Sequence, residues 1–197
     1  MTLILASTSR YRKSLLQRLQ IPFECRSPEV DESPLPGEPA EALALRLAGA
    51  KASAIASQAP EAWVLGSDQV AVVDGEVLGK PGNFERAFAQ LQSSSGREAR
   101  FLTGVALHRH RTGEAYAALH STTVRFRDLS AADIEHYLRA EAPWDCAGSF
   151  KCEGLGIALF EAIHSDDPTG LEGLPLITTC RLLRQAGIDP LAPAAAN

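Results

Sequence analysis

A strand and turn pattern is clearest in a stretch that reads Trp63-Val64-Leu65-Gly66-Ser67-Asp68-Gln69-Val70-Ala71-Val72-Val73-Asp74-Gly75-Glu76-Val77-Leu78-Gly79-Lys80-Pro81. The apolar run reverses at Asp74-Gly75, a pair of residues typical of a β-hairpin turn. Ser67, Asp68 and Gln69 interrupt the first strand of this hairpin. Polar side chains in a buried strand must be satisfied inside the protein or presented to a ligand. We interpret Asp68 as a functional carboxylate.

The returning strand of the hairpin is expected to bring Lys80 back to the level of Asp68, so that a carboxylate and an ammonium share one site. The same pattern fits a buried Asp68–Lys80 ion pair that only sets the register of the hairpin. The stretch alone leaves both interpretations open.

The length and composition of the chain indicate a soluble globular protein. Its 197 residues suit one domain, which spans 1–197 and has room for two small lobes. Hydrophobic residues make up 45% and charged residues 22%, and no apolar run approaches the length of a membrane span. The net charge of -5 argues against nucleic acid as a partner. Residues 192–197, rich in alanine, are expected to form a frayed tail.

The start of the chain carries no basic leader and no signal-peptide core, so we expect a cytoplasmic location. The four cysteines form no Cys-x-x-Cys pair and are predicted to be reduced and mostly buried. The five histidines show no metal-ligand spacing.

The N-terminal segment predicts a phosphate site. Leu3 to Ala6 forms a short apolar strand, and Ser9 is a plausible N-cap for the helix that follows. Arg10, Arg12 and Lys13 then place three positive charges in the first turn, where they oppose the helix dipole. A nearby anion would remove this conflict, so a phosphate site is favoured over a merely solvated helix start.

Two further charged positions stand out before the hairpin. Asp31 and Glu32 lie in a proline-rich loop after a predicted strand over 23–27. They either bind a divalent cation or are simply solvated, which is the commoner outcome for acidic loop residues and the one favoured by these residues alone. Lys51 lies on an otherwise apolar stripe of a helix that Pro39 is expected to open at its first position. Lys51 either snorkels out of the apolar face, which is the commoner outcome, or points its charge into a cleft.

The remaining elements follow from caps and periodicity. Helices are predicted after Asn83, after Ser130 with a capping box to Asp133, and from Pro175 onward, and strands are predicted over 101–108, 121–126 and 157–160. Glu153 precedes a glycine-rich bend, where the flat face of a ligand can approach the backbone. Gly154-x-Gly156 lacks a third glycine and leads into the predicted strand, so a dinucleotide fingerprint is rejected.

Six short motifs occur in one order along the chain. They are Ser7-Thr8-Ser9-Arg10-Tyr11-Arg12, Val30-Asp31-Glu32, Lys51, Gly66-Ser67-Asp68-Gln69, Gly79-Lys80-Pro81 and Gly148-Ser149-Phe150-Lys151-Cys152-Glu153-Gly154. Together they resemble the Maf family of nucleoside triphosphate pyrophosphatases from Leu3 to about Leu191. The resemblance implies an elongated mixed α/β fold with a central cleft between two lobes, shared with the inosine triphosphate pyrophosphatases. It also implies hydrolysis of a nucleoside triphosphate to the monophosphate and diphosphate with a divalent metal.

Within the family, Tyr11, Gln69 and Glu153 look like the specificity positions of the branch that hydrolyses 7-methyl-GTP. Members of that branch carry Trp at the place of Tyr11, and the family usually has Pro at the place of Arg10. The chemistry of the base agrees with this branch. Because 7-methylguanine is cationic, it gains from stacking on an aromatic ring and from pairing its N–H donors with a carboxylate.

The resemblance implies a role for each remaining residue of the site. Asp68 would activate water or hold the metal, and Glu32 would help bind Mg²⁺, Mn²⁺ or Co²⁺. Ser7, Arg12, Lys51 and Lys80 would hold the triphosphate. The alternatives are the same chemistry on dTTP, UTP or another modified nucleotide, and a nucleotide-binding regulator of cell division. The expected partner is the nucleotide, without nucleic acid or membrane, and a homodimer is left open.

Overall fold

The computed structural model describes residues 2–192. In chain order its elements are β1 (Leu3–Ala6), α1 (Arg10–Gln17), β2 (Phe23–Arg26), α2 (Ala40–Ala56), β3 (Trp63–Val73), β4 (Glu76–Leu78), α3 (Phe84–Ser94), β5 (Glu98–Arg109), β6 (Glu114–Phe126), α4 (Ala131–Glu141), the 3₁₀ turns η1 (Ala147–Ser149) and η2 (Leu155–Leu159), β7 (Phe160–His164), η3 (Gly170–Glu172) and α5 (Leu176–Gln185). The predicted frayed tail, apart from Ala192, lies outside the described residues.

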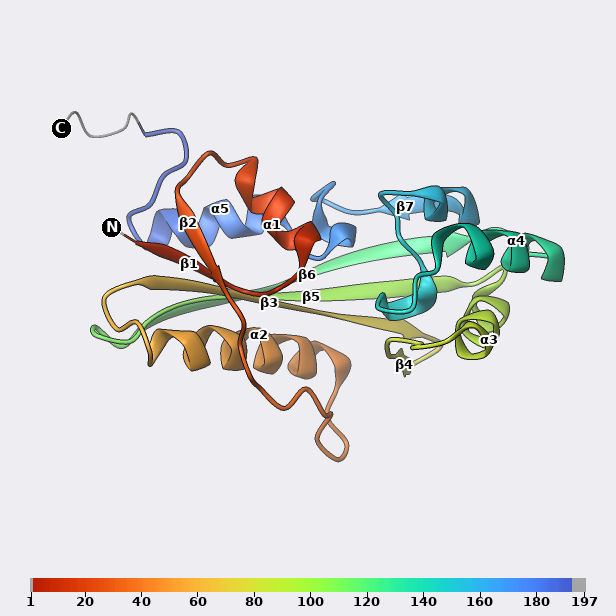
Figure 1. The fold of residues 1–197 in the computed structure, drawn as a ribbon, viewed down its shortest axis with the longest axis horizontal. Coiled ribbons are helices and arrows are strands. Elements are labelled where there is room, and N and C mark those ends of the chain that lie inside the picture. The colour runs from red at the N-terminus through yellow and green to blue at the C-terminus, as the bar shows by residue number, and fades with distance from the viewer. Residues whose placement is uncertain (1, 193–197) are drawn as a thin grey trace.

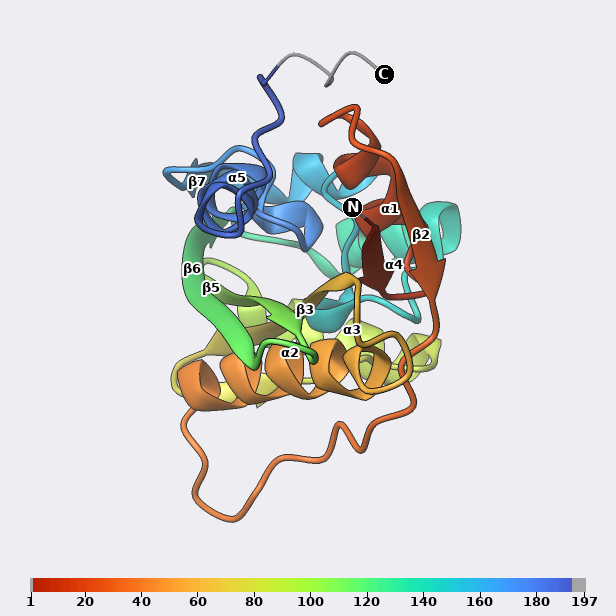
Figure 2. The same cartoon turned by 90° about the vertical axis from the view of Figure 1, so that its left-hand side faces the viewer.

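A mixed sheet runs along the long axis of the elongated molecule (Figure 1). Neighbouring strands follow the order β2-β1-β3-β5-β6-β7, and β4 pairs with β3. The β1 strand pairs in parallel with β2 and β3, whereas the β3–β5, β5–β6 and β6–β7 pairs are antiparallel. Viewed along this axis, α2 lies on one face of the sheet and α1 and α5 lie on the other (Figure 2). The fold is the mixed sheet flanked by helices that was predicted.

The long strands β3 and β5 contribute to different hydrophobic clusters at their two ends. In the first lobe, α1, α2 and α5 cover the sheet, and their core includes Ile4, Leu16 and Trp63. In the second lobe, α3 and α4 pack around the other end of the strands, with a core that includes Phe101 and Phe126. Figure 1 shows α3, α4 and β7 together at the end away from α1 and α5. The middle of β3 therefore lies between two separately packed regions.

Two glycines let α2 lie directly on the sheet. A Cβ atom at Gly66 would meet the Ala48 carbonyl oxygen at 2.2 Å, and one at Gly104 would meet the Ala44 carbonyl oxygen at 2.2 Å. Neither approach leaves space for a side chain. This close packing is what brings a residue of α2 against the polar interruption of β3.

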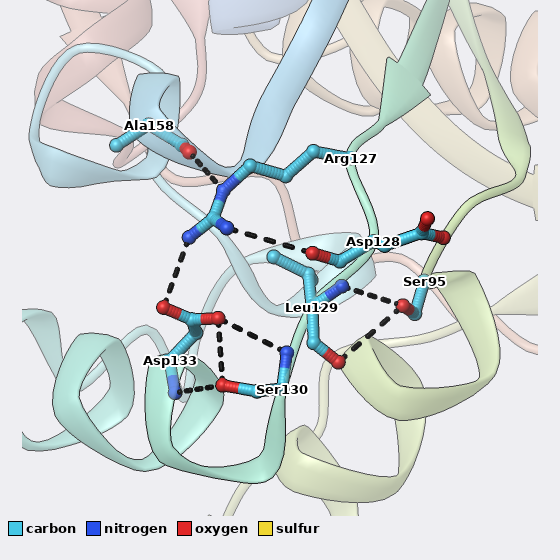
Figure 3. Close-up of polar contacts among 7 residues, drawn as sticks. All are labelled: Ser95, Arg127, Asp128, Leu129, Ser130, Asp133 and Ala158. Atoms are coloured by element: carbon cyan, nitrogen blue, oxygen red, sulfur yellow. Dashed lines mark hydrogen bonds and ion pairs between the residues drawn. The ribbon is translucent and has the colours of Figure 1, made fainter.

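The predicted helix starts are confirmed at Ser9, Asn83 and Ser130, each of which accepts an N-cap hydrogen bond. Figure 3 shows the Ser130 capping box with Asp133 and the Arg127 side chain beside it. Arg127 Nε donates to the Ala158 carbonyl oxygen at 2.9 Å, and Arg127 pairs with Asp133 at 3.1 Å. These contacts tie the start of α4 to η2.

Several predicted boundaries were wrong. Pro39 and Pro175 are N-cap residues, so α2 and α5 begin one residue later than predicted. Strands β5 and β6 extend to 98–109 and 114–126, because continuous cross-strand pairing carries both strands past their apolar centres. The predicted strand 157–160 is instead a 3₁₀ turn followed by β7.

This last error has a local cause. The Gly156 N–H donates to the Lys151 carbonyl oxygen at 3.1 Å, and a Cβ atom at Gly156 would lie 2.3 Å from that oxygen. The chain is therefore curled back at this point. A short apolar run does not distinguish such a turn from a strand.

The cysteines are less buried than predicted: Cys25 is exposed, and Cys146, Cys152 and Cys180 are intermediate. All four are free thiols. Among the described residues, no helix combines the length and the apolar character that crossing a bilayer requires.

Candidate active site

A cleft of about 870 Å³ opens beside the middle of β3. Its lining contains every residue that the sequence singled out for the site, namely Ser7, Tyr11, Arg12, Glu32, Lys51, Asp68, Gln69, Lys80 and Glu153. They come from the start of α1, the loop before α2, α2 itself, the β3–β4 hairpin and the bend before η2. The fold thus gathers residues separated by up to 146 positions (153 − 7) into one cavity.

Lys51 connects the two predicted carboxylates. Its Nζ atom lies 2.6 Å from Glu32 Oε1 and 2.5 Å from Asp68 Oδ1. Lys51 is 6% exposed and Asp68 is 8% exposed, so this contact is largely shielded from water. Of the two interpretations of Lys51, snorkelling is wrong, because its ammonium group is buried against Asp68 in the cleft.

Lys80 reaches the same cleft but has a different partner from the predicted one. It lies 3.9 Å from Glu32 Oε2, and its side chain is 64% exposed. Asp68 pairs with Lys51 instead, so the interpretation of a buried Asp68–Lys80 register pair is wrong. Strand β4 ends at Leu78, and Lys80 leaves the sheet before it can meet Asp68.

The charges around Glu32 favour its ionised form. Burial by itself raises the pKa of Glu32, but the hydrogen bond and charge of Lys51, with smaller effects of Lys80 and Arg12, outweigh burial and lower it below the ordinary value. Glu32 is therefore a carboxylate at neutral pH.

The cleft contains candidate ligands for a divalent cation. Two carboxylates converge on one positive charge, and Lys51 stands where a cation between them would be stabilised. Among residues 2–192 no cluster of three or more His, Cys, Asp or Glu side chains is suited to a metal ion. Mg²⁺ is commonly bound by one or two carboxylates together with phosphate oxygens, so Glu32 and Asp68 are the residues of the cleft that could hold such an ion.

The positive side of the cleft is built around the start of α1. Ser7 is buried, and its Oγ atom accepts a hydrogen bond from the Ser9 N–H at 3.1 Å. Arg12 Nε donates to the Gly173 carbonyl oxygen at 2.9 Å, which fixes the direction of the guanidinium group. Desolvation lowers the pKa of Arg12 from its ordinary value, and the charges of Asp68 and Glu32 oppose this effect.

At the aromatic end of the cleft, the Arg10 side chain lies over the Tyr11 ring. The Arg10 guanidinium carbon lies 4.8 Å from the centre of the Tyr11 ring, and Arg10 Nη2 donates to the Tyr11 hydroxyl at 2.7 Å. Glu153 is exposed on a bend where Gly154 packs against Glu141, since a Cβ atom at Gly154 would meet Glu141 Oε1 at 2.5 Å. A ring that carries one cation has the electrostatic character needed to bind another.

The cysteines of the cleft are not prepared for nucleophilic attack. Burial, followed by the charge of Asp145, raises the pKa of Cys146 to about 12. Burial and the charge of Glu153 raise the pKa of Cys152 to about 12. Both thiols remain protonated at neutral pH, which agrees with a packing role.

The segment Gly170–Gly173 was missed from the sequence. Its carbonyl groups accept hydrogen bonds from Gln69, Arg12 and Ser67. It also brings Glu172 into the cleft, where desolvation and the charge of Glu153 raise the pKa of the Glu172 carboxyl. The backbone carbonyls leave no trace in the sequence, although the run of turn residues before Pro175 marks an irregular segment.

Comparison with known proteins finds relatives along most of the chain. A family model described as "Maf-like protein" matches residues 2–186. A protein of Xanthomonas campestris pv. campestris (strain 8004) named "7-methyl-GTP pyrophosphatase" is 60% identical over 187 residues, which cover 95% of this chain and 97% of that protein. A protein of Albidiferax ferrireducens with the same name is 58% identical over 189 residues, which cover 96% of this chain and 95% of that protein.

A solved structure titled "The structure of the Staphylococcus aureus Ham1 protein" shares the fold, with a TM-score of 0.50, 15% sequence identity and coverage of 79% of this chain and 90% of that one. The family match spans the sheet, its flanking helices and all the residues of the cleft. By this match and by its two relatives, the chain belongs to the Maf-like protein family.

Proposed function

We propose that the protein is a nucleoside triphosphate pyrophosphatase that hydrolyses 7-methyl-GTP to 7-methyl-GMP and diphosphate, with a divalent metal cation. The single observation that carries the chemistry is the convergence of Glu32 and Asp68 on the Lys51 ammonium inside the cleft. The names of the close relatives support the choice of base.

Asp68 is the proposed general base. Its Oδ1 atom accepts a hydrogen bond from Lys51, and its Oδ2 atom accepts none from the described part of the chain. A water molecule held at Oδ2 would lose its proton to the carboxylate as its oxygen attacks the α-phosphorus. The bond from the α-phosphorus to the bridging oxygen then breaks, and diphosphate leaves.

The positive groups of the cleft are assigned to the triphosphate. Lys51 lies at one carboxylate oxygen of Glu32 and Lys80 lies near the other, and Arg12 and Ser7 line the cleft beside the start of α1. Fixed positive charge in a shielded site stabilises the charge that develops on the leaving diphosphate. A divalent cation held by Glu32 and Asp68 would neutralise part of the same charge.

Tyr11, Gln69 and Glu153 are assigned to the base. The Tyr11 ring would stack on the cationic methylated ring, and the Glu153 carboxylate would accept from its N–H donors. This assignment requires Arg10 to give up its place over Tyr11, which exchanges one cation for another. The proposal includes a cytoplasmic location and a nucleotide as the partner.

The test measures diphosphate release from 7-methyl-GTP, GTP, UTP and dTTP, each with Mg²⁺, Mn²⁺ or Co²⁺. The expected result is the highest kcat/KM for 7-methyl-GTP. A higher kcat/KM for UTP or dTTP would contradict the choice of 7-methyl-GTP and assign the protein to the pyrimidine-specific branch, while the proposed pyrophosphatase reaction would stand. Nucleotide binding without any turnover would leave a regulator rather than an enzyme.

The base assignment has its own test in Glu153→Gln. This change keeps the size of the side chain but replaces a charged acceptor with an amide that also presents N–H groups. Discrimination for 7-methyl-GTP over UTP is expected to fall by about 2 kcal/mol, with turnover of UTP nearly unchanged. An unchanged ratio would remove Glu153 from base recognition.

A further inference from the structure

Two buried polar residues shape the segment behind the cleft. Asp167 is 2% exposed and Thr169 is 4% exposed, and neither lines the cavity. Asp167 Oδ1 accepts hydrogen bonds from the Thr169 N–H at 3.0 Å and the Thr169 hydroxyl at 2.6 Å. Asp167 Oδ2 accepts from the Ile177 N–H at 2.6 Å, and Thr169 Oγ1 accepts from the Leu176 N–H at 2.8 Å. These bonds clamp both ends of the segment Gly170–Gly173 to the start of α5.

The clamped segment determines the orientation of the Gln69 amide. Gln69 Nε2 donates to Thr103 Oγ1 at 3.0 Å, to the Gly170 carbonyl oxygen at 3.0 Å and to the Leu171 carbonyl oxygen at 3.3 Å. A primary amide has two N–H donors, so both are engaged. The reverse orientation would place Gln69 Oε1 against two carbonyl oxygens. Oε1 is therefore the atom of this amide that remains for a ligand.

An acceptor at this position selects one kind of base edge. Gln69 and Glu153 both line the cleft, so the free Gln69 Oε1 atom and the Glu153 carboxylate are two acceptors available to a ligand there. The edge of guanine carries two adjacent N–H donors, whereas uracil and thymine carry one donor between two carbonyl oxygens. Two acceptors match the first pattern and repel the second.

We propose that Asp167 and Thr169 are positioning residues for base selection. They hold the carbonyl groups of Gly170 and Leu171 in place, and these carbonyls turn the Gln69 amide so that its oxygen faces the nucleotide. The proposal deepens the function proposed above and rests on it for the identity of the substrate.

The test compares Thr169→Val with the matched control Thr179→Val. Thr179 is fully buried, and its hydroxyl donates to the Pro175 carbonyl oxygen at 2.8 Å within α5. Both variants lose one buried hydroxyl, but only Thr169→Val releases the segment that holds Gln69. We expect Thr169→Val to lower the 7-methyl-GTP to UTP ratio of kcat/KM by about tenfold, the scale of the one hydrogen bond that Gln69 Oε1 would form with the base. Thr169→Ser should restore the ratio, and Thr179→Val should leave it unchanged.

A second measurement does not depend on turnover. The side-chain amide resonances of Gln69, assigned in a ¹⁵N spectrum with Gln69→Ala, should shift in Thr169→Val and not in Thr179→Val. Unchanged resonances and an unchanged ratio in Thr169→Val would overturn the inference, as would equal changes in the control. If the wild type hydrolyses no nucleoside triphosphate, the proposed function is wrong. The Gln69 resonances then still test whether Thr169 positions the Gln69 amide. If Thr169→Val does not fold, Asp167→Asn replaces it, because the amide keeps one acceptor oxygen.

Discussion

Lys51 keeps the two carboxylates of the cleft from repelling each other. Asp68 and Glu32 each form an ion pair with its ammonium group, at 2.5 and 2.6 Å. Glu32 comes from a loop, and its side chain is 48% exposed. Asp68 lies on the buried strand β3. The site therefore consists of one buried carboxylate, one half-exposed carboxylate and a lysine between them.

Asp68→Asn is expected to abolish most of the activity without unfolding the protein. The amide does not accept a proton from water, and loss of a general base costs roughly 100-fold or more in kcat. Lys51 retains Glu32 as a partner, so the melting temperature should change little. Diphosphate release and thermal unfolding measure the two effects, with the exposed Asp74→Asn as control. A folded Asp68→Asn protein with near-normal kcat would refute the assignment.

The two lysines should respond differently to removal of their charge. Lys51→Ala leaves Asp68 buried without its partner and is expected to cost about 3 kcal/mol of folding free energy as well as activity. Lys80→Ala should leave the melting temperature unchanged, because an exposed pair at 3.9 Å contributes little, yet it should lower kcat/KM. Equal kcat/KM for Lys80→Ala and the wild type would exclude Lys80 from the triphosphate site.

At the scale of elements, the site depends on how closely α2 approaches the sheet. Gly104 faces Ala44, and an added Cβ atom would lie 2.2 Å from a backbone oxygen that cannot rotate away. Gly104→Ala is expected to destabilise the fold by about 1–3 kcal/mol. It should also lower kcat, because α2 carries Lys51 away from Asp68 as it shifts.

The control for this change is a glycine of α2 itself, Gly49. A Cβ atom at Gly49 would meet only His108 Cε1 at 3.9 Å, an ordinary contact. Gly49→Ala should therefore be neutral or stabilising, since alanine favours the helix. Urea unfolding of the two variants measures the difference. Equal stability of Gly104→Ala and the wild type would show that the helix does not depend on this approach.

The capping box of α4 predicts an acid-sensitive element. Hydrogen bonds from the Ser130 hydroxyl, from Arg127 and from the Ser130 N–H lower the pKa of Asp133 from 3.8 to about 2. A carboxyl group with a lowered pKa stabilises the folded state above its unfolded pKa, and this contribution disappears as the pH falls from about 4 to about 2. Asp133→Asn should lower the melting temperature at pH 6 and remove part of its decrease between pH 4 and pH 2. The control is the exposed Asp166→Asn, which should keep the wild-type profile.

At the scale of the whole molecule, the cleft lies between two regions with separate hydrophobic cores. Strands β3 and β5 connect these regions, and the candidate site residues come from both sides of the junction. A nucleotide that contacts both sides stabilises the folded chain through its binding free energy.

This linkage can be measured without turnover in Asp68→Asn. At a concentration 100 times its Kd, 7-methyl-GTP with Mg²⁺ should add about 2.7 kcal/mol and raise the melting temperature by roughly 5–10 °C. The nucleoside 7-methylguanosine, which lacks the triphosphate, should give a much smaller shift. If 7-methyl-GTP does not raise the melting temperature, it does not bind the folded protein, and the site assignments that depend on its binding are wrong.

The sequence alone determined the local chemistry of the chain. Caps at Ser9, Asn83 and Ser130 and the turn at Asp74-Gly75 are short-range signals, and the structure places helices and a hairpin at these positions. The polar interruption at Asp68 likewise indicated a site, because a buried strand tolerates such residues only with partners. The order of the motifs indicated the family before any contact was known.

Only the tertiary structure decided which of these residues meet. The partner of Asp68 is Lys51 rather than Lys80, because Gly66 and Gly104 bring α2 onto the sheet while β4 ends at Leu78. The role of the segment Gly170–Gly173 depends on backbone carbonyl groups, which are identical in every residue type. Ion pairs and carbonyl contacts across the chain depend on how the elements pack, and sequence periodicity reports only which face of an element is buried.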